Sequence, residues 1–288
     1  MNIKSMEFQV AIRIHDKHFL FEDRNVLSNF IFVKNPFMHW LADPFVLEYR
    51  GEHYLFVESA NRITGKGHLL YTKINENITT KYKWKVLMKK KFHLSFPNVF
   101  VEDNRLKMIP ETYQDGCIAI YECLGKMENW KKNDVVVGGS AFVDTIQYND
   151  LFITYDISCD LCKLKLFSSD GSILDSIDDT SFSLRPAGKL IYNDNQAIFV
   201  SQKCQKIYGE GLVFQRINIL ENGKMKIKRL FEINYSDLNS TFKSNDFVGI
   251  HTYNFDECFE VIDVRKTRFN LFGLIGKIID KLKKRKKA

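Results

Sequence analysis

Length, composition and charge bound the class of protein. The chain has 288 residues, of which 45% are hydrophobic and 14% aromatic, with 24 Phe and 12 Tyr but only 5 Pro. This composition excludes a disordered chain and favours a β-rich globular protein, because aromatic residues are enriched in strands. The net charge is +7, yet nine basic residues and one acidic residue follow position 265, so the body is almost neutral. A nucleic-acid-binding surface spread over the body is therefore excluded.

The N-terminal segment and the cysteines indicate the compartment. The first residues contain no apolar run typical of a signal peptide, and no stretch reaches the ~18 consecutive apolar residues that would span a bilayer. Six cysteines are too few for a disulfide framework in a chain of this length. The pair Cys159 and Cys162 is interpreted as two packed thiols, because no second pair completes a zinc site. We therefore expect a reduced, cytoplasmic protein.

Five segments along the chain share one pattern. Each begins with polar or proline-containing residues, continues into an alternating apolar strand, turns at polar residues, and ends with an aromatic strand and a polar residue. The turns are rich in residues that tolerate the left-handed conformation of short hairpins. The segments are 42–59, 96–113, 143–156, 185–202 and 249–266, and four of the turns are Arg50-Gly51, Asp103-Asn104, Asn149-Asp150 and Asn193-Asp194.

The spacing of these repeats predicts the fold. Their starting residues are Asp43, Pro97, Asp144, Pro186 and His251, which lie 42 to 65 positions apart. Units of about 40–50 residues with several strands each are typical of propeller blades. We predict an all-β, five-bladed β-propeller over residues 1–268, in which the early strand 8–14 closes the ring beside the last blade. A β-sandwich would not explain polar residues at the same point of each unit.

The last 20 residues depart from this pattern. Residues 269–288 place apolar side chains, among them Leu271, Ile275 and Ile279, at helical spacing, and lysines on the other face and at the end. A basic amphipathic helix of this kind is typical of membrane-surface binding. We expect it to hold the protein on an anionic membrane, at the inner face of the cell membrane. The alternative is a helix packed on the propeller with a solvated charged end.

The repeated polar residues are the candidates for chemistry. The innermost strands of a propeller converge on one central funnel, so polar residues far apart in sequence meet there. Asp43 and Asp144 hold matching places in two repeats, and Glu210 lies in a glycine-flanked loop. Each also has a structural interpretation, as a hairpin cap or, for His251, a buried structural histidine. The expected substrate-binding residues are His39, Trp40, His93, Glu111, Arg185, Tyr208, His251 and Arg265.

The motifs as a set resemble a known family. They comprise HWLADPF (39–45), HLSFP (93–97), IPET (109–112), RPAGK (185–189), YGEGL (208–212), GIHT (249–252) and VIDVR (261–265). Over residues 8–266 the chain resembles the propeller domain of the glucosamine inositolphosphorylceramide transferase type. It is more distantly similar to the five-bladed propellers of glycoside hydrolase family 43.

The resemblance to the hydrolases implies roles for three carboxylates. It implies that Asp43 is the general base, that Asp144 orients the acid, and that Glu210 is the general acid. Asp144 is followed by Thr145, where the hydrolases usually have proline, and Glu210 lies in a Gly-Glu-Gly context unlike their acid motif. By analogy, a central divalent ion near His251 is implied, whereas no spacing of residues in this sequence assigns metal ligands.

Three classes of function remain open. The first is a membrane-associated glycosyltransferase of bacterial-type surface or lipid-linked glycan synthesis, such as lipopolysaccharide synthesis, with a nucleotide-sugar donor and a glycan or lipid-linked acceptor. Its donor diphosphate would be received by Arg185 and neighbouring cations. The second is a glycoside hydrolase that uses the same carboxylates, and the third is a non-catalytic glycan-binding domain. The basic tail and the absence of a signal peptide favour the transferase, because lipid-linked intermediates are made on the inner leaflet.

Overall fold

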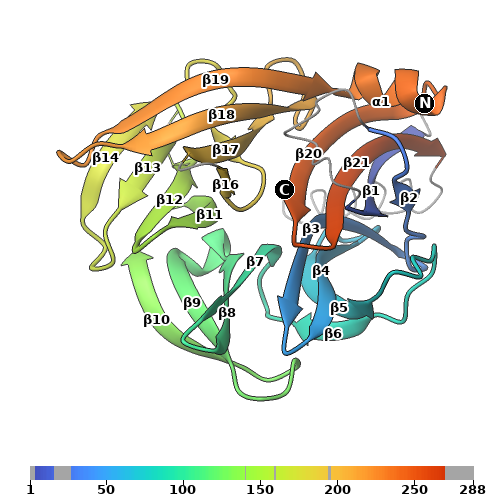
Figure 1. The fold of residues 1–288 in the computed structure, drawn as a ribbon, viewed down its shortest axis with the longest axis horizontal. Coiled ribbons are helices and arrows are strands. Elements are labelled where there is room, and N and C mark those ends of the chain that lie inside the picture. Colours follow the sequence, from blue (N-terminus) through green and yellow to red (C-terminus); the bar gives the residue numbers. More distant parts are fainter. Residues whose placement is uncertain (1–3, 16–26, 140, 159, 194–195, 270–288) are drawn as a thin grey trace, which may run out of the picture.

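The chain folds into five antiparallel sheets arranged around a central axis (Figure 1). The computed structural model describes residues 4–15, 27–139, 141–158, 160–193 and 196–269. Four of the sheets have four strands, and the other has five. The predicted all-β, five-bladed propeller is therefore confirmed.

The first two blades follow one another along the chain. The turns at Arg50-Gly51 and Asp103-Asn104 have positive φ at both residues, as predicted for short hairpins. Blade one consists of β3 (His39–Tyr49), β4 (Glu52–Asn61), β5 (Gly67–Ile74) and β6 (Lys85–Met88), from the axis outwards. Blade two consists of β7 (Ser95–Glu102), β8 (Arg105–Glu111), β9 (Cys117–Cys123) and β10 (Trp130–Gly138), with the 3-10 helix η1 (Tyr113–Asp115) before β9.

Blades three and four continue the ring. The innermost position of blade four is divided between two short strands, which both pair with the same neighbour. Blade three consists of β11 (Phe142–Tyr148), β12 (Leu151–Asp156), β13 (Lys163–Phe167) and β14 (Ile173–Asp178). Blade four consists of β15 (Arg185–Pro186), β16 (Ile191–Asn193), β17 (Gln196–Lys203), β18 (Gly211–Ile219) and β19 (Met225–Asn234).

Blade five is built from both ends of the described chain. Its inner strands β20 (Phe247–Phe255) and β21 (Phe259–Phe269) are completed by β1 (Lys4–Ile14) and β2 (Ile31–Phe32). β1 pairs with β21 along its whole length, from Lys4 opposite Phe269 to Ile14 opposite Phe259. This pairing within blade five confirms that the early strand closes the ring beside the last blade.

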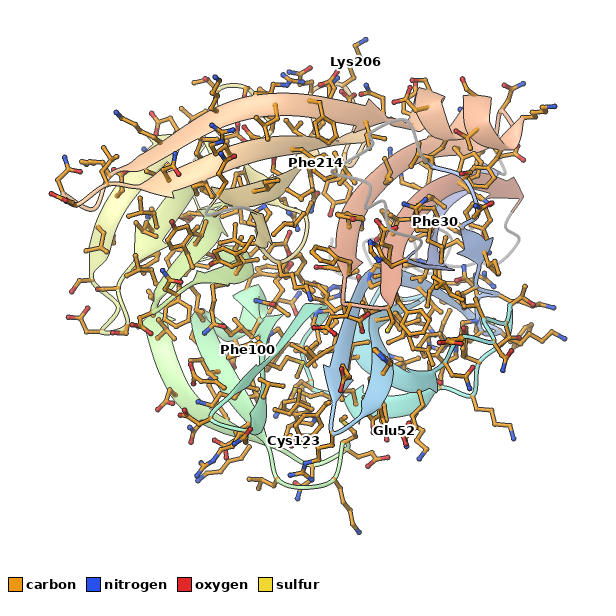
Figure 2. All side chains as sticks on the ribbon, in the orientation of Figure 1. Phe30, Glu52, Phe100, Cys123, Lys206 and Phe214 are labelled. Atoms are coloured by element: carbon orange, nitrogen blue, oxygen red, sulfur yellow. The ribbon has the colours of Figure 1, made fainter. Side chains whose placement is uncertain are left out.

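Apolar side chains fill the spaces between neighbouring blades (Figure 2). Phe30 and Phe214 are both buried and belong to one cluster between blades four and five. Other clusters join blade five to blade one and blade two to blade three. Since burying a side chain of this size contributes about 1.5–3 kcal/mol, these layers hold the ring together and fix the positions of the innermost strands.

A short α-helix lies between two of the described strands. α1 (Tyr235–Phe242) lies between β19 and β20, buries Leu238, and begins where Asp237 accepts a hydrogen bond from the backbone N–H of Asn234. It was not expected from the repeats. The predicted amphipathic helix at 269–288 lies outside the described residues except for Phe269, which ends β21. Among the described helices, none has the length and apolar character required to cross a membrane.

Candidate functional site

The innermost strands β3, β7, β11, β15 and β20 surround the central axis (Figure 1). A cavity of about 480 Å³ is lined by residues of these strands and of the strands and loops beside them. Residues from all five blades contribute to its wall, so it is the central funnel that the sequence predicted. It is lined by ionisable and aromatic side chains, a combination suited to polar rings such as sugars. These are Phe8, Trp40, Asp43, Glu58, His93, Glu111, Tyr113, Arg185, Tyr208 and His251.

β-Bulges at the same point of the innermost strands bring the site residues together. In β3, β7 and β11 the bulge contains a residue with positive φ, namely Asp43 (46°), Phe96 (46°) and Asp144 (51°). The register of β20 also shifts at His251. A bulge re-aims its side chain and holds a non-glycine residue in a left-handed conformation, which costs about 1–3 kcal/mol. The second repeat therefore aligns through Phe96, one residue before the predicted Pro97.

Asp43 is buried and held from both sides. Its Oδ1 accepts a hydrogen bond from Thr252 Oγ1 at 2.9 Å, and its Oδ2 accepts one from the backbone N–H of Phe96 at 3.1 Å. Burial raises the pKa of Asp43 to about 6, although the adjacent His251 acts in the opposite direction. At neutral pH the carboxyl is mostly ionised and is a stronger base than an exposed aspartate.

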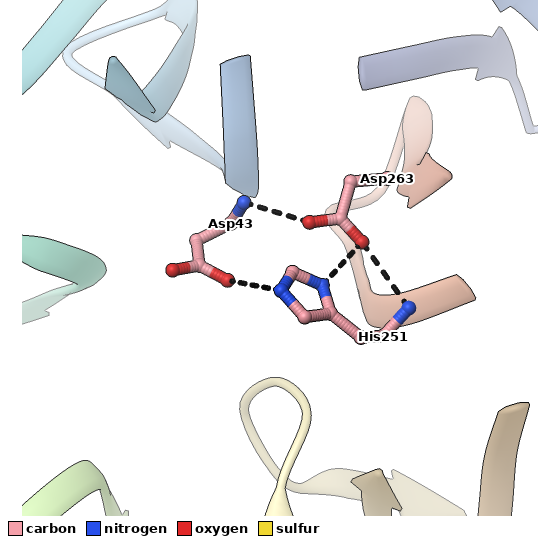
Figure 3. A group of neighbouring side chains, drawn as sticks. All are labelled: Asp43, His251 and Asp263. Carbon is pink, nitrogen blue, oxygen red and sulfur yellow. Dashed lines mark hydrogen bonds and ion pairs between the residues drawn. The ribbon is translucent and has the colours of Figure 1, made fainter. Parts of the chain in front are cut away.

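His251 lies between two carboxylates (Figure 3). Its Nδ1 is 2.7 Å from Asp263 Oδ1, and its Nε2 is 3.7 Å from Asp43 Oδ1. Burial lowers the pKa of His251, but the charge and hydrogen bond of Asp263 and the charge of Asp43 together outweigh it, so the net pKa is raised. Asp263 also accepts the backbone N–H groups of Asp43 and Thr252, at 2.9 Å each. Asp263 therefore orients both the imidazole and the backbone of the base.

Glu111, Arg185 and Asp144 form a second polar group in the funnel. Arg185 Nε donates a hydrogen bond to Asp144 Oδ2 at 2.5 Å, and Arg185 Nη2 lies 3.7 Å from Glu111 Oε2. Burial, and after it the charge of Asp144, raises the pKa of Glu111 to about 8, although Arg185 opposes this. Glu111 is thus mostly protonated at neutral pH and can donate a proton. Asp144 adjoins the cavity through Arg185 and does not line it.

Glu58 is a cavity residue that was not predicted. It pairs with Ala42 immediately before the bulge of β3, as Glu111 pairs with Ser95 immediately before the bulge of β7. The sequence did contain a signal for Glu58, because Glu58 and Glu111 are the polar residues at the ends of their repeats. Burial, and then the charge of Asp43, raises the pKa of Glu58 well above its usual value. Its buried Oε1 makes no hydrogen bond with any residue that the structure describes, and its ion-pair contact is His93 Nε2 at 3.3 Å.

His93 stands beside this carboxyl. The backbone N–H of Gly67 donates to His93 Nδ1 at 3.0 Å, so the ring proton is on Nε2, which lies 3.3 Å from Glu58 Oε1. Burial lowers the pKa of His93. The imidazole is therefore neutral at pH 7 and presents an N–H group to the cavity.

Aromatic rings form part of the cavity wall. Trp40 is half-buried, while Tyr113 and Tyr208 are 37% and 41% exposed. The Arg185 guanidinium lies 5.3 Å from the centre of the Tyr208 ring, and the Tyr208 ring lies 5.5 Å from that of His251. Exposed rings above polar groups provide a flat apolar surface for a bound ring and donors and acceptors for its hydroxyls.

Besides Asp144, three predicted residues lie outside the cavity lining. Glu210 is buried between Lys203, whose Nζ is 3.7 Å from Glu210 Oε1, and the backbone N–H of Lys206, which donates to Glu210 Oε2. His39 faces His68, with 5.5 Å between the ring centres. Arg265 donates to the backbone oxygen of Val248. The position expected for the acid Glu210 is therefore corrected: the carboxyls in the cavity are those of Asp43, Glu58 and Glu111, because the loop before β18 turns Tyr208 inward and Glu210 away.

Asp43, His251 and Asp263 are also the described residues that could hold a metal ion, since one donor atom of each lies within 4.8 Å of the others. Their present bonds link them to one another. The carboxylate of Asp263 already accepts three backbone N–H groups and contacts the imidazole. Asp43 Oδ1 and His251 Nε2 therefore remain as the donor atoms that face the cavity. The central ion that the hydrolase resemblance implies stays a prediction.

Comparison with known proteins identifies the family. The family described as glucosamine inositolphosphorylceramide transferase 1, N-terminal, matches residues 34–258. The chain belongs to this family. The family match contains the cavity carboxyls Asp43, Glu58 and Glu111 as well as Arg185 and His251, whereas Asp263 lies beyond it. The Arabidopsis thaliana protein glucosamine inositolphosphorylceramide transferase 1 is 24% identical over 235 residues, which cover 76% of this chain. Those residues span 30% of the plant protein's length.

Solved structures of low sequence identity share the fold of this family member. An α-L-arabinofuranosidase from Podospora anserina is 10% identical with a TM-score of 0.50, and the match covers 80% of this chain and 92% of that one. A β-fructofuranosidase from Bombyx mori is 14% identical with a TM-score of 0.52, over 77% and 54%. An exo-β-1,3-galactanase from Clostridium thermocellum is 11% identical with a TM-score of 0.50, over 78% and 61%. These similarities show the propeller fold.

Proposed function

We propose that this protein acts in sugar transfer during glycan synthesis, and that the central cavity holds the reacting sugar. The observation that carries the proposal is the pair of buried carboxyls that line this one cavity, Asp43 held by Thr252 and the backbone of Phe96, and Glu111 beside Arg185. Asp43 is mostly ionised at neutral pH, and Glu111 is mostly protonated. Two carboxyls whose environments separate their pKa values are the arrangement that acid–base chemistry at a glycosidic bond requires.

The roles follow from the protonation states. Asp43 takes the proton of the acceptor hydroxyl, whose oxygen forms a bond to the anomeric carbon of the transferred sugar. The bond from that carbon to the leaving oxygen breaks, and Glu111 gives its proton to the leaving oxygen. Thr252 and the backbone N–H of Phe96 fix the Asp43 carboxylate, so little reorganisation is needed when the proton moves.

The remaining cavity groups bind the sugar. Glu58 Oε1 and the Nε2–H of His93 offer an acceptor or donor to hydroxyls, and Trp40 and Tyr208 offer faces for the ring. The family relationship supports a role in synthesis, since the plant relative is named as a transferase. That name and the basic residues of 269–288 support a lipid-linked acceptor at an anionic membrane surface, on its cytoplasmic side.

Glycoside hydrolysis is the second candidate function, and it is favoured by the ion pairs that Arg185 already makes. A nucleotide-sugar donor carries a diphosphate that needs cations. Arg185 is the one arginine that lines the cavity among the described residues, and it is already held by Asp144 and Glu111. With water in place of the acceptor hydroxyl, Asp43 and Glu111 would perform the same proton transfers. The two candidates therefore differ in the attacking group and the donor.

A panel of nucleotide sugars and free glycans tests the proposal, with thermal shift as the first measurement and product analysis as the second. Stabilisation by one nucleotide sugar, followed by transfer to an added acceptor, is the expected result. Release of free sugar from a glycan, with no response to any nucleotide sugar, would replace transfer by hydrolysis. Asp43→Asn and Glu111→Gln should keep ligand binding and lose turnover in either case. Binding with no turnover by the wild type would leave a glycan-binding module and refute the proposed catalysis.

A further inference from the structure

A second cavity, of about 690 Å³, lies at the opposite mouth of the propeller. All five blades contribute to it through the far ends of their innermost segments, with Leu47 from β3, Phe100 from β7, Gln147 from β11, Leu190 before β16 and Phe255 from β20. On each of these segments, the residue that lines the second cavity comes three to five positions after a residue that lines the central cavity. Along an extended strand this separation corresponds to about 10–17 Å.

A layer of hydrogen bonds between blades separates the two cavities. Asn254 Nδ2 donates to the backbone oxygen of Pro44 at 2.9 Å, and Asn254 Oδ1 accepts from the backbone N–H of Lys189 at 2.9 Å. Asn98 Nδ2 donates to the backbone oxygen of Thr145 at 3.0 Å. The second cavity is therefore distinct from the site proposed for sugar transfer.

The wall of the second cavity is mainly apolar. Leu47, Phe100 and Phe255 are half-buried, Leu190 is buried, and Tyr192 is 61% exposed. Three acidic residues also line it: Glu48 and Glu257 are exposed at its border, and Asp256 is buried. Concave apolar walls with a few polar groups are the usual form of small-molecule sites.

Lys189 is the one cation in the lining of the second cavity. Its Nζ lies 5.4 Å from the centre of the Phe255 ring and makes no hydrogen bond or ion pair with any residue described in the structure. Burial lowers the pKa of Lys189 to about 8, with a smaller opposite effect from Asp256. Asp256 is engaged elsewhere, because its carboxylate binds His53 Nδ1 at 2.8 Å and accepts the backbone N–H of Phe259. The ammonium group thus feels the charge of Asp256 but forms no ion pair with a residue that the structure describes.

We propose that the second cavity binds a small organic anion, with a flat apolar body against the aromatic wall and one carboxylate, sulfonate or phosphate group at Lys189. An anion at this position would form the ion pair that the Lys189 ammonium lacks within the described part of the chain. A hydrogen bond between two charged groups in an apolar cavity is stronger than one between neutral groups. The apolar body would remove Leu47, Phe100 and Phe255 from water. The proposal is independent of the reaction in the central cavity.

The test compares two fluorescent probes of similar shape, the anion 1-anilinonaphthalene-8-sulfonate and the uncharged N-phenyl-1-naphthylamine. The wild-type chain should bind the anion at least tenfold more tightly than the neutral probe. Lys189→Met should weaken binding of the anion about tenfold or more and leave the neutral probe within twofold, because a hydrogen bond to a charged group is lost and the apolar wall is kept. Lys189→Arg should retain the preference. Lys228→Met, at an exposed position on β19, is the matched control and should change neither probe.

Each alternative result decides against the site. Equal affinities of the wild type for the two probes, or an unchanged anion affinity in Lys189→Met, would overturn the proposal. Equal weakening of both probes in that variant would mean that the lysine only packs against Phe255. Circular dichroism establishes that each variant is folded, and Lys189→Gln replaces Lys189→Met if the latter does not fold.

Discussion

Asp263 is the residue whose replacement should disturb the central site most. It is fully buried, and its two oxygens accept four N–H groups. Oδ2 accepts the backbone N–H of Asp43, while Oδ1 accepts those of His251 and Thr252 and faces the imidazole. In Asp263→Asn the amide nitrogen must take the place of one oxygen. Whichever way the amide turns, a buried backbone N–H then meets a second donor instead of an acceptor.

The size of the effect follows from these contacts. A buried donor left without a partner costs about 1–3 kcal/mol. Removal of one partner from a buried ion pair costs about 3–5 kcal/mol, because the His251 cation keeps its desolvation penalty. These terms overlap, since they share the same carboxylate. We expect Asp263→Asn to lower the free energy of unfolding by about 3–5 kcal/mol.

Urea unfolding followed by tryptophan fluorescence measures this change. The midpoint should fall at an unchanged m-value, since the surface exposed on unfolding stays the same. Glu257→Gln is the matched control, because Glu257 is an exposed carboxylate at the turn before β21, and it should remain within about 0.5 kcal/mol of the wild type. A change of less than 0.5 kcal/mol for Asp263→Asn would refute the role given to the buried carboxylate.

Three further predictions concern pH, packing and the tail. Burial raises the pKa of Glu111 from 4.5 to about 8, so stability is highest below pH 4.5 and is lost progressively as pH rises from 4.5 through about 8. Melting temperatures from pH 5 to 9 should fall less in Glu111→Gln, and parallel curves would contradict this. In urea unfolding, Gly209→Ala should lower the free energy of unfolding by about 1–3 kcal/mol more than Gly51→Ala. Both glycines have positive φ, but only a Cβ at position 209 would approach His251 Cβ, to 2.7 Å. Equal losses of stability in the two variants would exclude this contact. Truncation after Arg268 should abolish sedimentation with anionic vesicles and leave the propeller folded, whereas unchanged sedimentation would exclude the tail as the membrane anchor.

The propeller fold could be predicted from the sequence because each blade repeats the same pattern of apolar strands and polar turns. The turns at Arg50-Gly51 and Asp103-Asn104 need left-handed residues. The strands beside them have runs of consecutive buried residues, because each blade packs against a neighbour on both faces. The strand at 8–14 was predicted to close the ring beside the last blade, and it does so by pairing with the last strand, β21. α1 was missed because its eight residues follow β19 directly and bury only Leu238, so a short helix without a wide apolar face left little periodic signal.

The site was predictable only in part. Asp43 and His251 lie at the β-bulges, where the repeats have polar residues, and sequence comparison among blades locates such positions. Glu58 closes its repeat as Glu111 does, yet its direction depends on the register with Ala42, which the repeat alone does not give. Glu210 stands two residues after Tyr208 in the same loop, and only the course of that loop decides which of them faces the cavity.

In the proposed function, Asp43 and Glu111 act as base and acid on a sugar in the central cavity. The most direct measurement is turnover of the substrate found in the panel by wild type, Asp43→Asn and Glu111→Gln, with the exposed Glu48→Gln as control. Each cavity variant should lose about 10²–10⁴-fold in kcat and keep its affinity for the sugar, while the control retains full turnover. Wild-type turnover in both cavity variants would contradict the assignment of the acid–base pair.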